Sequence, residues 1–314
     1  LKSLQHAGWR VLAADGSDQA VGIYTVERGY QIPYAADSAY LPALMSICVQ
    51  EKVDYVFPGL DAELPALASA REDFHRKGIQ LVVSPSEIVA LCDDKLATPQ
   101  FLVEHGVPAP YTLSAVEASG WKGSFPVVLK PRIGGCRSVG VHRAVDRDQL
   151  DKRLQEVNAS QYVIQEEIDG PEYTCGSITF NHHCYGVIAM LRTLRAGDTY
   201  KARVVKDDAI ERTVKKVAGL LGPFGPCNFQ LRLKAGVPYI FEINARCSGT
   251  THARALAGFN EPKMTVEYLQ NGKEPAFSIR EITILRYWSE LVVGNERIEQ
   301  LRKTGSIEGV ARDL

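Results

Sequence analysis

The run from Asn228 to Arg246 constrains the fold of this chain more than any other segment, because polar and apolar residues alternate through it on both sides of Gly236. A period of two with a glycine in the middle predicts two antiparallel strands joined by a tight turn at residues 234–237. Successive side chains of a strand point to opposite faces. The hairpin is therefore expected to have one apolar face that belongs to a core and one polar face.

The register of this hairpin brings oxygen-bearing side chains together. It pairs four couples of residues: Gln230 with Glu242, Asn228 with Asn244, Phe229 with Ile243, and Leu231 with Phe241. Mg²⁺ takes one or two protein carboxylates and completes its shell with water and phosphate, so a polar face with a single formal charge suits it. An ordinary hairpin with one face in solvent gives the same pattern. Arg246 on the polar face favours the metal-nucleotide interpretation.

Length and composition leave room for two domains and a large core. The chain has 314 residues, of which 45% are hydrophobic, and a formal net charge of −1. A charge near zero gives no electrostatic reason to expect nucleic acid or an anionic membrane as a partner. No apolar run approaches the roughly 20 residues of a membrane-spanning helix. We therefore expect neither a nucleic acid nor a membrane partner.

The seven cysteines are scattered, odd in number and contain no C-x-x-C pair. This spacing argues against a disulfide framework and against a zinc site. A reducing, cytoplasmic setting is therefore expected.

The first 92 residues alternate between predicted strands and predicted helices. Strands are expected at 9–14, 53–57 and 80–83, and helices at 39–51 and 61–77. This order predicts βαβ crossovers and a parallel sheet. Asp15 and the turn at 58–61 follow strands, where open α/β sheets bind ligands, although turns and caps use the same residues. Residues 1–8 resemble the end of a helix, so we expect that the sequence begins after the first strand and glycine turn of its first α/β unit.

The next part of the chain is predicted to be richer in strands. A helix from Ser86 and another from about residue 93 to Gly106 lead to a linker that contains Pro108 and Pro110. Strands are expected at 127–130, 139–143, 162–167, 176–180 and 184–190, and helices at 146–157, 208–221 and 252–271. The tail beyond Pro275 is amphipathic and receives no assignment.

A candidate phosphate site lies where the strand ending in Lys130 meets a glycine-rich turn at 133–138. Glycines let backbone amides close on phosphate oxygens, and the lysine adds a positive charge. A β-hairpin also needs glycine in its turn, so the pattern fits a plain hairpin as well. It is not a P-loop, because no G-K-[ST] opens a helix.

Three further segments carry candidate ligand contacts. Lys95 follows two acidic residues before a helix. The segment 163–174 is predicted to be a strand, a Gly-Pro turn and a second strand; such a connection can offer backbone groups to an adenine edge, and Glu172 an acceptor to ribose hydroxyls. A basic loop surrounds Gly197-Asp198 with Arg192, Arg195 and Lys201, and it fits an anion contact or a solvated turn equally.

Taken in order, these segments resemble the ATP-grasp superfamily over nearly all of the chain. The resemblance is carried by Asp94-Lys95 before a helix, VVLKPRIGG, QEEIDGPEYT, CNFQ and FEINARCSGTT. It implies an α/β and α+β fold in which a Rossmann-like, pre-ATP-grasp domain precedes a two-lobed ATP-grasp fold. The implied limits are 1–92 for the first domain, 93–275 for the ATP-grasp domain (lid lobe about 111–175, core lobe about 176–275), and 276–314 for a C-terminal extension.

The resemblance also implies roles for individual residues and two cofactors, ATP and Mg²⁺. The implied phosphate contacts are Lys95, Lys130, Gly134, Gly135 and Ser138; the adenine hinge is Gln165, Glu166, Glu167 and Ile168; Glu172 binds ribose. Gln230, Glu242 and Asn244 would hold two Mg²⁺ ions, for which Mn²⁺ could substitute. Arg246 would be the catalytic residue that steadies the phosphoryl group.

Two departures from the common family pattern stand out. Many members carry an acid where Gln230 stands, and the Gln-Glu-Asn set looks most like the large-chain domains of carbamoyl-phosphate synthetase. The glycine turn reads Gly-Gly-Cys-Arg-Ser instead of G-x-G-S. The group that would touch the γ-phosphate therefore stays open.

The family chemistry implies an enzyme, an ADP-forming ligase that makes C–N bonds. It would activate a small carboxylate as an acylphosphate for attack by an amine, and a homodimer is left open as its assembly. A carbamoyl-phosphate synthetase-like domain that acts on bicarbonate or carbamate is an alternative, as is a non-catalytic ATP-binding module. A dinucleotide-dependent oxidoreductase lacks its visible glycine fingerprint here.

Overall fold

The computed structural model describes residues 1–134 and 139–309. They form two compact units. The first unit comprises Leu1–Val82 and the chain from Tyr287 onward, and the second unit comprises Val83–Arg286. The domain and lobe limits expected from the sequence stay predictions.

The first unit is an α/β unit built around two small sheets. Its helices are α1 (Lys2–His6), α2 (Val21–Tyr24), α3 (Tyr40–Glu51), α4 (Leu64–Ser69), α5 (Arg71–His75) and α12 (Asn295–Thr304), with a 3-10 turn at Asp61–Glu63. Its strands are β1 (Leu12–Asp15), β2 (Arg28–Gln31), β3 (Tyr55–Val56), β4 (Gln80–Leu81) and β15 (Ser306–Glu308).

The βαβ prediction is confirmed for the second crossover, because β3 and β4 pair in parallel, whereas β1 pairs in parallel with β2, a strand that was not predicted. The predicted single sheet is wrong in two respects. The strands form separate sheets, β1-β2-β15 and β3-β4, and β15 joins β2 antiparallel from the far end of the chain. The predicted helix at 61–77 is broken at Ala70, whose φ of −95° and ψ of 4° leave the helical range.

The second unit holds two antiparallel sheets. Its helices are α6 (Ser86–Asp93), α7 (Ala97–Glu104), α8 (Arg147–Glu156), α9 (Asp208–Leu221), α10 (Thr251–Leu256) and α11 (Glu261–Asn271), with 3-10 turns at Ala115–Gly120 and Ala159–Gln161. Its strands are β5 (Thr112–Ser114), β6 (Val127–Pro131), β7 (His142–Ala144), β8 (Tyr162–Glu166), β9 (Glu172–Phe180), β10 (His183–Arg195), β11 (Asp198–Val205), β12 (Gly225–Lys234), β13 (Val237–Asn244) and β14 (Thr283–Leu285).

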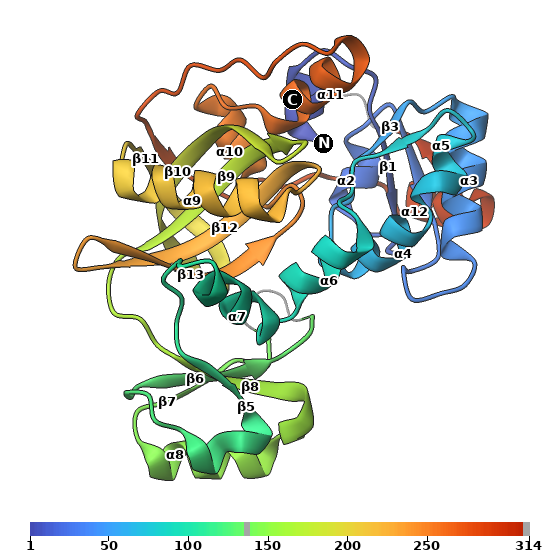
Figure 1. The fold of residues 1–314 in the computed structure, drawn as a ribbon. Helices are drawn as coiled ribbons and strands as arrows, with labels where there is room; N and C mark the ends of the chain where they lie inside the picture. Colours follow the sequence, from blue (N-terminus) through green and yellow to red (C-terminus); the bar gives the residue numbers. More distant parts are fainter. Residues whose placement is uncertain (135–138, 310–314) are drawn as a thin grey trace. The chain divides into compact units, whose positions relative to one another are not determined.

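The smaller sheet has the order β5-β8-β6-β7, and α8 lies along it (Figure 1). Val127, Leu129, Leu150 and Ile164 are fully buried between the sheet and α8. Asp146 caps α8, because its carboxylate accepts a hydrogen bond of 2.9 Å from the Gln149 amide. This lobe places Lys130 near the end of β6.

The larger sheet has the order β13-β12-β9-β10-β11-β14, and one of its faces packs against α9. The α9 sequence has apolar residues at helical spacing, and Val214 and Val217 are fully buried. The predicted limits 208–221 agree with those of α9. They are set by Asp207, which caps the first amides, and by Gly222, which has a φ of 66°.

The opposite face of this sheet has two halves of different chemistry. One half is apolar, and Ile178, Phe180 and Met190 pack there against Phe259 and Met264 from the α10–α11 region. The other half carries the polar side chains of the predicted hairpin. Both halves lie on the same strands, which Figure 1 shows running through the sheet.

The structure refines one predicted segment, corrects a second and adds a strand to a third. The basic loop around Gly197-Asp198 is the turn of a long hairpin, because β10 continues to Arg195 and β11 returns antiparallel. The predicted helix at 252–271 is split into α10 and α11, since Gly258 has a φ of 96° and a Cβ there would lie 2.0 Å from the Ser278 carbonyl oxygen. The unassigned tail contributes β14, which pairs with β11.

Among the described residues, no helix is long and apolar enough to cross a bilayer. The described cysteines, which exclude Cys136, are free thiols.

Candidate active site

The β12–β13 hairpin has the predicted register at its polar end. Asn228 lies opposite Asn244, and Gln230 lies opposite Glu242. The predicted pairing of Leu231 with Phe241 is wrong, because the register shifts after Gln230 and Leu231 pairs with Ile240. A bulge sets two residues against one and turns the extra side chain. Phe241 is that residue, and its ring centroid lies 5.8 Å from Lys130 Nζ.

Glu242 is held by two amide groups on the polar face. Its Oε1 accepts hydrogen bonds from Gln230 Nε2 at 3.1 Å and from Asn244 Nδ2 at 3.0 Å. Gln230 Oε1 accepts from Arg192 Nη2 at 2.6 Å. A guanidinium only donates, so Arg192 fixes which end of the Gln230 amide faces Glu242.

The donor set of this face fits Mg²⁺ at Glu242, a carboxylate flanked by amides. Within the described chain, no cluster of three or more His, Cys, Asp or Glu could hold a metal, so a metal site here depends on Glu242 with neutral groups. The Gln230 oxygen faces a cation, Arg192, in this arrangement. Glu242 therefore fits a direct metal ligand best, and the full set of Gln230, Glu242 and Asn244 stays a prediction.

A second carboxylate, Glu172, is clamped by two arginines. Arg192 donates two hydrogen bonds to Glu172 Oε1, at 2.9 and 2.6 Å. Arg232 donates two to Oε2, at 3.2 and 3.0 Å. Sequence reasoning placed Arg192 in a loop and did not single out Arg232. The available signal was the period of two, because Arg232 follows Gln230 by two residues and Glu172 lies opposite Arg232.

Lys130 is buried near the polar face. Its Nζ donates to Gln165 Oε1 at 2.8 Å, and only 7% of the residue is exposed. Burial lowers the pKa of Lys130 to about 8, while attraction to Glu242 acts in the opposite direction. Gln165 in turn donates to Thr112 Oγ1 at 3.0 Å. The side chain of Gln165 thus positions the lysine.

Lys95 and its neighbours fasten the start of the glycine turn. Lys95 Nζ donates to the Gly134 carbonyl, and the Gly134 amide donates to Asp93 Oδ1 at 2.8 Å. Arg132 pairs with Asp94 at 2.7 Å. Burial would raise the pKa of Asp94, but hydrogen bonds from Arg132 and from two backbone amides lower it overall. The structure thus brings Lys95 and Gly134 together.

Two residues of the predicted phosphate site, Gly135 and Ser138, lie outside the described residues.

The predicted adenine hinge comprises the last two residues of β8, Gln165 and Glu166, and the two residues after it. The amide of Glu166 donates to the Tyr111 carbonyl at 2.9 Å, and that of Glu167 donates to the Pro126 carbonyl at 3.0 Å. The Ile168 carbonyl accepts from Arg232 at 3.0 Å. The hinge is therefore tied both to the smaller sheet and to the Glu172 clamp.

Arg246 begins the loop after β13. Its amide donates to the Asn244 carbonyl at 2.8 Å, and its Nη1 donates to the Cys247 carbonyl at 2.8 Å. The backbone contact ties the position of Arg246 to Asn244. Arg246 is thus held next to Asn244, whose side-chain amide donates to Glu242.

A buried ion pair beneath the polar face escaped the sequence analysis. Arg254 and Glu261 have no exposed side-chain area, and their charged groups lie 3.1 Å apart. Burial raises the pKa of Glu261 to about 7, although Arg254 opposes the shift. The two residues lie in separate short helices, and no periodic pattern in the sequence reports such a pairing.

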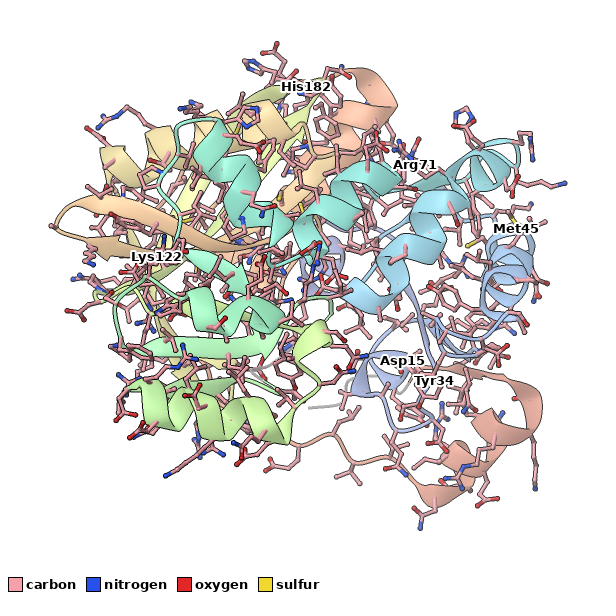
Figure 2. All side chains as sticks on the ribbon, turned by 60° about the horizontal axis from the view of Figure 1, so that its bottom comes forward. Asp15, Tyr34, Met45, Arg71, Lys122 and His182 are labelled. Carbon is pink, nitrogen blue, oxygen red and sulfur yellow. The ribbon has the colours of Figure 1, made fainter. Side chains whose placement is uncertain are left out.

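Asp15, the candidate in the first unit, behaves as a turn residue. Its Oδ1 accepts from the Ser17 amide at 2.9 Å. Tyr34 packs beside it, because a Cβ on Gly16 would lie 2.5 Å from the Tyr34 ring, and Figure 2 shows Asp15 and Tyr34 close together. This geometry explains Asp15 without a ligand.

Two family models match parts of this chain. Residues 1–82 match the PylC-like N-terminal domain, and residues 142–289 match a family described as ATP-grasp in the biosynthetic pathway with Ter operon. The chain is 25% identical over 300 residues to a carbamoyl-phosphate synthase of Methanobrevibacter smithii, covering 88% of this chain and 77% of that protein. It spans only 18% and 25% of the carbamoyl phosphate synthase large chains of Thermomicrobium roseum and Thermoanaerobacter sp..

Solved structures share the fold. The L-amino acid ligase from Bacillus licheniformis matches with a TM-score of 0.65 at 22% identity, over 85% of this chain and 69% of that chain. The ADP complex of N5-carboxyaminoimidazole synthetase from Staphylococcus aureus matches with a TM-score of 0.69 at 16% identity, over 89% and 75%. Together with the family models, these likenesses confirm the predicted resemblance of this chain to the ATP-grasp superfamily and its fold.

Proposed function

We propose that this chain is an ATP-dependent ligase that joins a small carboxylate to an amine and releases ADP and phosphate. One observation carries the proposal. The buried amine of Lys130, from the smaller sheet, lies beside Phe241 and interacts with the charge of Glu242 on the larger sheet. This combination suits phosphoryl transfer, because that reaction depends on positioning and on neutralising charge.

The phosphates of ATP would meet positive charge and backbone amides. The proposed contacts are Lys95, Lys130, Gly134, Gly135 and Ser138. The tie between Lys95 and Gly134 supports this grouping, because it holds a lysine at the start of the glycine turn. ATP phosphates would then replace the Gly134 carbonyl as partner of the lysine.

Adenine would lie against the hinge of Gln165, Glu166, Glu167 and Ile168. The amides of Glu166 and Glu167 already donate within the protein, so the donor that we propose for adenine is the Ile168 amide. Glu172 accepts four hydrogen bonds from two arginines, which is the capacity of a carboxylate. A ribose hydroxyl would have to replace one of these arginine donors.

Glu242 would hold Mg²⁺, with Gln230 and Asn244 beside it; we propose two ions, for which Mn²⁺ could substitute. When bound, the metal neutralises charge on the transferring phosphoryl group. Arg246 is the proposed catalytic residue and would steady the same group from the loop after β13. Its guanidinium suits a phosphoryl group because its donors form a planar fork.

The proposed reaction consists of two displacements. A carboxylate oxygen of the substrate attacks the γ-phosphorus of ATP, and the bond to ADP breaks to leave an acylphosphate. The amine nitrogen then attacks the acyl carbon, loses a proton and expels phosphate. The residues of the site supply charge and alignment to both steps, and no covalent enzyme intermediate is required.

An ADP-release screen across amino acids and small carboxylates tests this proposal. ADP and phosphate should appear only when a carboxylate and an amine are both present. Hydroxylamine should replace the amine and yield a hydroxamate, because it traps an acylphosphate. Release of AMP and pyrophosphate would overturn the mechanism.

A second candidate function follows from the match to carbamoyl-phosphate synthase and from Gln230 in the metal set. In this case bicarbonate would be the phosphorylated substrate. The same screen distinguishes it, because bicarbonate alone would then stimulate ADP release. Tight binding of ATP without turnover in any arm would instead favour a non-catalytic ATP-binding module.

A further inference from the structure

We propose that Arg254 is a positioning residue that sets the direction of the hydrogen bonds along Asn228, Asn244 and Glu242, and thereby orients the carboxylate that would hold Mg²⁺. The inference rests on the proposed function, because it takes Glu242 as the metal ligand.

The direction follows from the chemistry of the guanidinium. Arg254 Nη1 donates to Asn228 Oδ1 at 3.0 Å, and a guanidinium has no acceptor. The Asn228 oxygen must therefore face Arg254, and its Nδ2 donates to Asn244 Oδ1 at 3.1 Å. The remaining end of the Asn244 amide is Nδ2, which donates to Glu242 Oε1 at 3.0 Å.

Neighbouring side chains prevent this chain of bonds from reversing. Thr174 Oγ1 donates to the same Asn228 oxygen at 2.8 Å, which adds a second reason for that oxygen to face inward. Reversal of the Asn228 amide would set its NH₂ group against Arg254 and leave buried donors without acceptors. Such an arrangement costs about 1–3 kcal/mol for each unsatisfied group.

Glu261 and a glycine keep Arg254 in place. Glu261 pairs with Arg254 Nε, and both side chains are fully buried. Gly176 lies opposite Asn228 in the sheet, and a Cβ there would lie 2.4 Å from Glu261 Oε1 and 2.7 Å from Arg254 Nε. The absence of a side chain at Gly176 therefore makes room for the ion pair directly under the metal face.

The other arm of Arg254 reaches the loop that starts with Arg246. Arg254 Nη2 donates to Ser248 Oγ at 2.7 Å, and Ser248 also shares a hydrogen bond of 2.8 Å with Thr250. One guanidinium thus joins the Glu242 face to the loop after β13. A fixed distance between these two parts is what a phosphoryl-transfer site requires.

Stability alone does not account for this ion pair. A buried pair of charges can often be replaced by apolar residues of similar volume without loss of stability, because desolvation offsets the attraction. Arg254 also donates to Asn228 and to Ser248, so its guanidinium reaches toward the site and does not contact Glu261 alone. Orientation of the polar side chains of the site explains why this ion pair is present, whereas packing does not.

The test uses the full chain with both charges replaced, Arg254→Met together with Glu261→Met. Binding of Mn²⁺ in the presence of ADP is measured by electron paramagnetic resonance, and folding by circular dichroism and thermal melting. Loss of a group that orients a metal ligand typically weakens metal affinity 10–100-fold, so we expect a weakening of about that size in a folded protein. The control changes another ion pair on α11, the exposed Lys263 and the half-buried Glu267, as Lys263→Met with Glu267→Met, and should leave Mn²⁺ affinity unchanged.

Each outcome is decisive. A folded double variant that binds Mn²⁺–ADP as tightly as the parent overturns the positioning role but leaves the proposed function intact. Failure of the parent protein itself to bind Mn²⁺–ADP overturns the proposed function. Should the methionine variant not fold, Arg254→Gln with Glu261→Gln takes its place, because glutamine can both donate and accept and no longer enforces one direction. Unchanged affinity in that variant would equally reject the proposal.

Discussion

The two halves of one sheet face in the second unit differ in what their side chains do. On β9, Ile178 and Phe180 are buried against the α10–α11 region, whereas Glu172 and Thr174 on the same face hydrogen-bond to Arg192, Arg232 and Asn228. The backbone is continuous and the period of two is unbroken. The residues that stabilise the core and the polar residues of the candidate site therefore lie on the same face of one strand, at opposite ends of it, and not on opposite faces of the sheet.

Gly176 lies where the two halves meet. Apolar contacts begin on one side of it and the hydrogen-bonded row begins on the other, while the Arg254–Glu261 pair fills the space that its missing side chain leaves. The comparison predicts that changes in the polar half reduce turnover and changes in the apolar half reduce stability. A change at the junction should reduce both.

The largest effect is expected in the polar half, for Glu242→Gln. The substitution keeps the shape of the side chain and removes the charge that would hold the metal. We expect ADP release to fall at least about a thousandfold, or about 4 kcal/mol, with little change in melting temperature. Steady-state kinetics with excess Mg²⁺ measures it. Glu267→Gln, at a half-buried position of α11, is the matched control, and unchanged turnover in Glu242→Gln would refute the metal assignment.

Phe180→Ala, in the apolar half, should lower stability and leave turnover nearly unchanged. Phe180 is 2% exposed and stacks on Tyr268 with ring centroids 3.9 Å apart. Removing a buried phenyl ring costs about 3 kcal/mol or more in the free energy of unfolding, which urea denaturation would measure. Turnover per folded molecule should stay near that of the parent. A specific loss of turnover in a protein of normal stability would break the division between the halves.

Gly176→Ala tests the junction. The added methyl group would overlap Glu261 and Arg254, and overpacking of this kind costs about 1–3 kcal/mol. We expect the free energy of unfolding and the affinity for Mn²⁺–ADP to fall together. Gly120→Ala is the control, because no atom lies within 4 Å of a Cβ there. A stable Gly176→Ala protein with normal metal affinity would show that the junction tolerates displacement of the ion pair.

The smallest effect concerns pH and Lys130. The folded protein holds this pKa at about 8, below the ordinary value of 10.5, so the charged amine is lost as pH rises through 8. Affinity for ATP should therefore fall by at most about tenfold per pH unit above pH 8. Calorimetric titration from pH 7 to pH 9.5 measures this change. Lys130→Arg, which stays charged throughout, should remove the pH dependence, and its persistence would point to another group.

The same pKa shift has a consequence for stability. Between pH 8 and pH 10.5 the unfolded chain binds more protons at Lys130 than the folded protein does. The contribution of Lys130 to the free energy of unfolding therefore rises with pH across that range. Below pH 8 both states hold the proton, and the penalty for burying the charged amine is fully present.

Local sequence signals predicted the regular parts of the fold well. The limits of α9 follow from an Asp cap, an apolar stripe and a terminal glycine, all of which lie within the segment itself. The polar end of the β12–β13 hairpin follows from alternation. The bulge after Gln230 does not follow from alternation, because the place of a single extra residue depends on how the strand twists against its neighbours.

The clustering of the site was predictable only in part. Family resemblance assigned Lys130 and Glu242, and the structure brings both to one region of the second unit. Arg232 was missed although the period of two places it on the face of Gln230. Arg254 was missed because its position in a short helix gives no sign of whether it faces solvent or a buried carboxylate. β14 was missed for a similar reason, since three residues of an irregular tail become a strand only where β11 offers an edge.

The sequence by itself predicted the family resemblance, many of the strands and helices and the face on which Gln230, Glu242 and Asn244 lie, because periodicity and motif order are properties of the chain. Tertiary structure alone decided which charges meet. Arg192 and Arg232 on Glu172, and Arg254 on Glu261, are contacts between segments whose separation along the chain carries no local signal. Burial strengthens these contacts. Because a guanidinium can only donate, it also fixes the direction of the hydrogen bonds that surround Glu242.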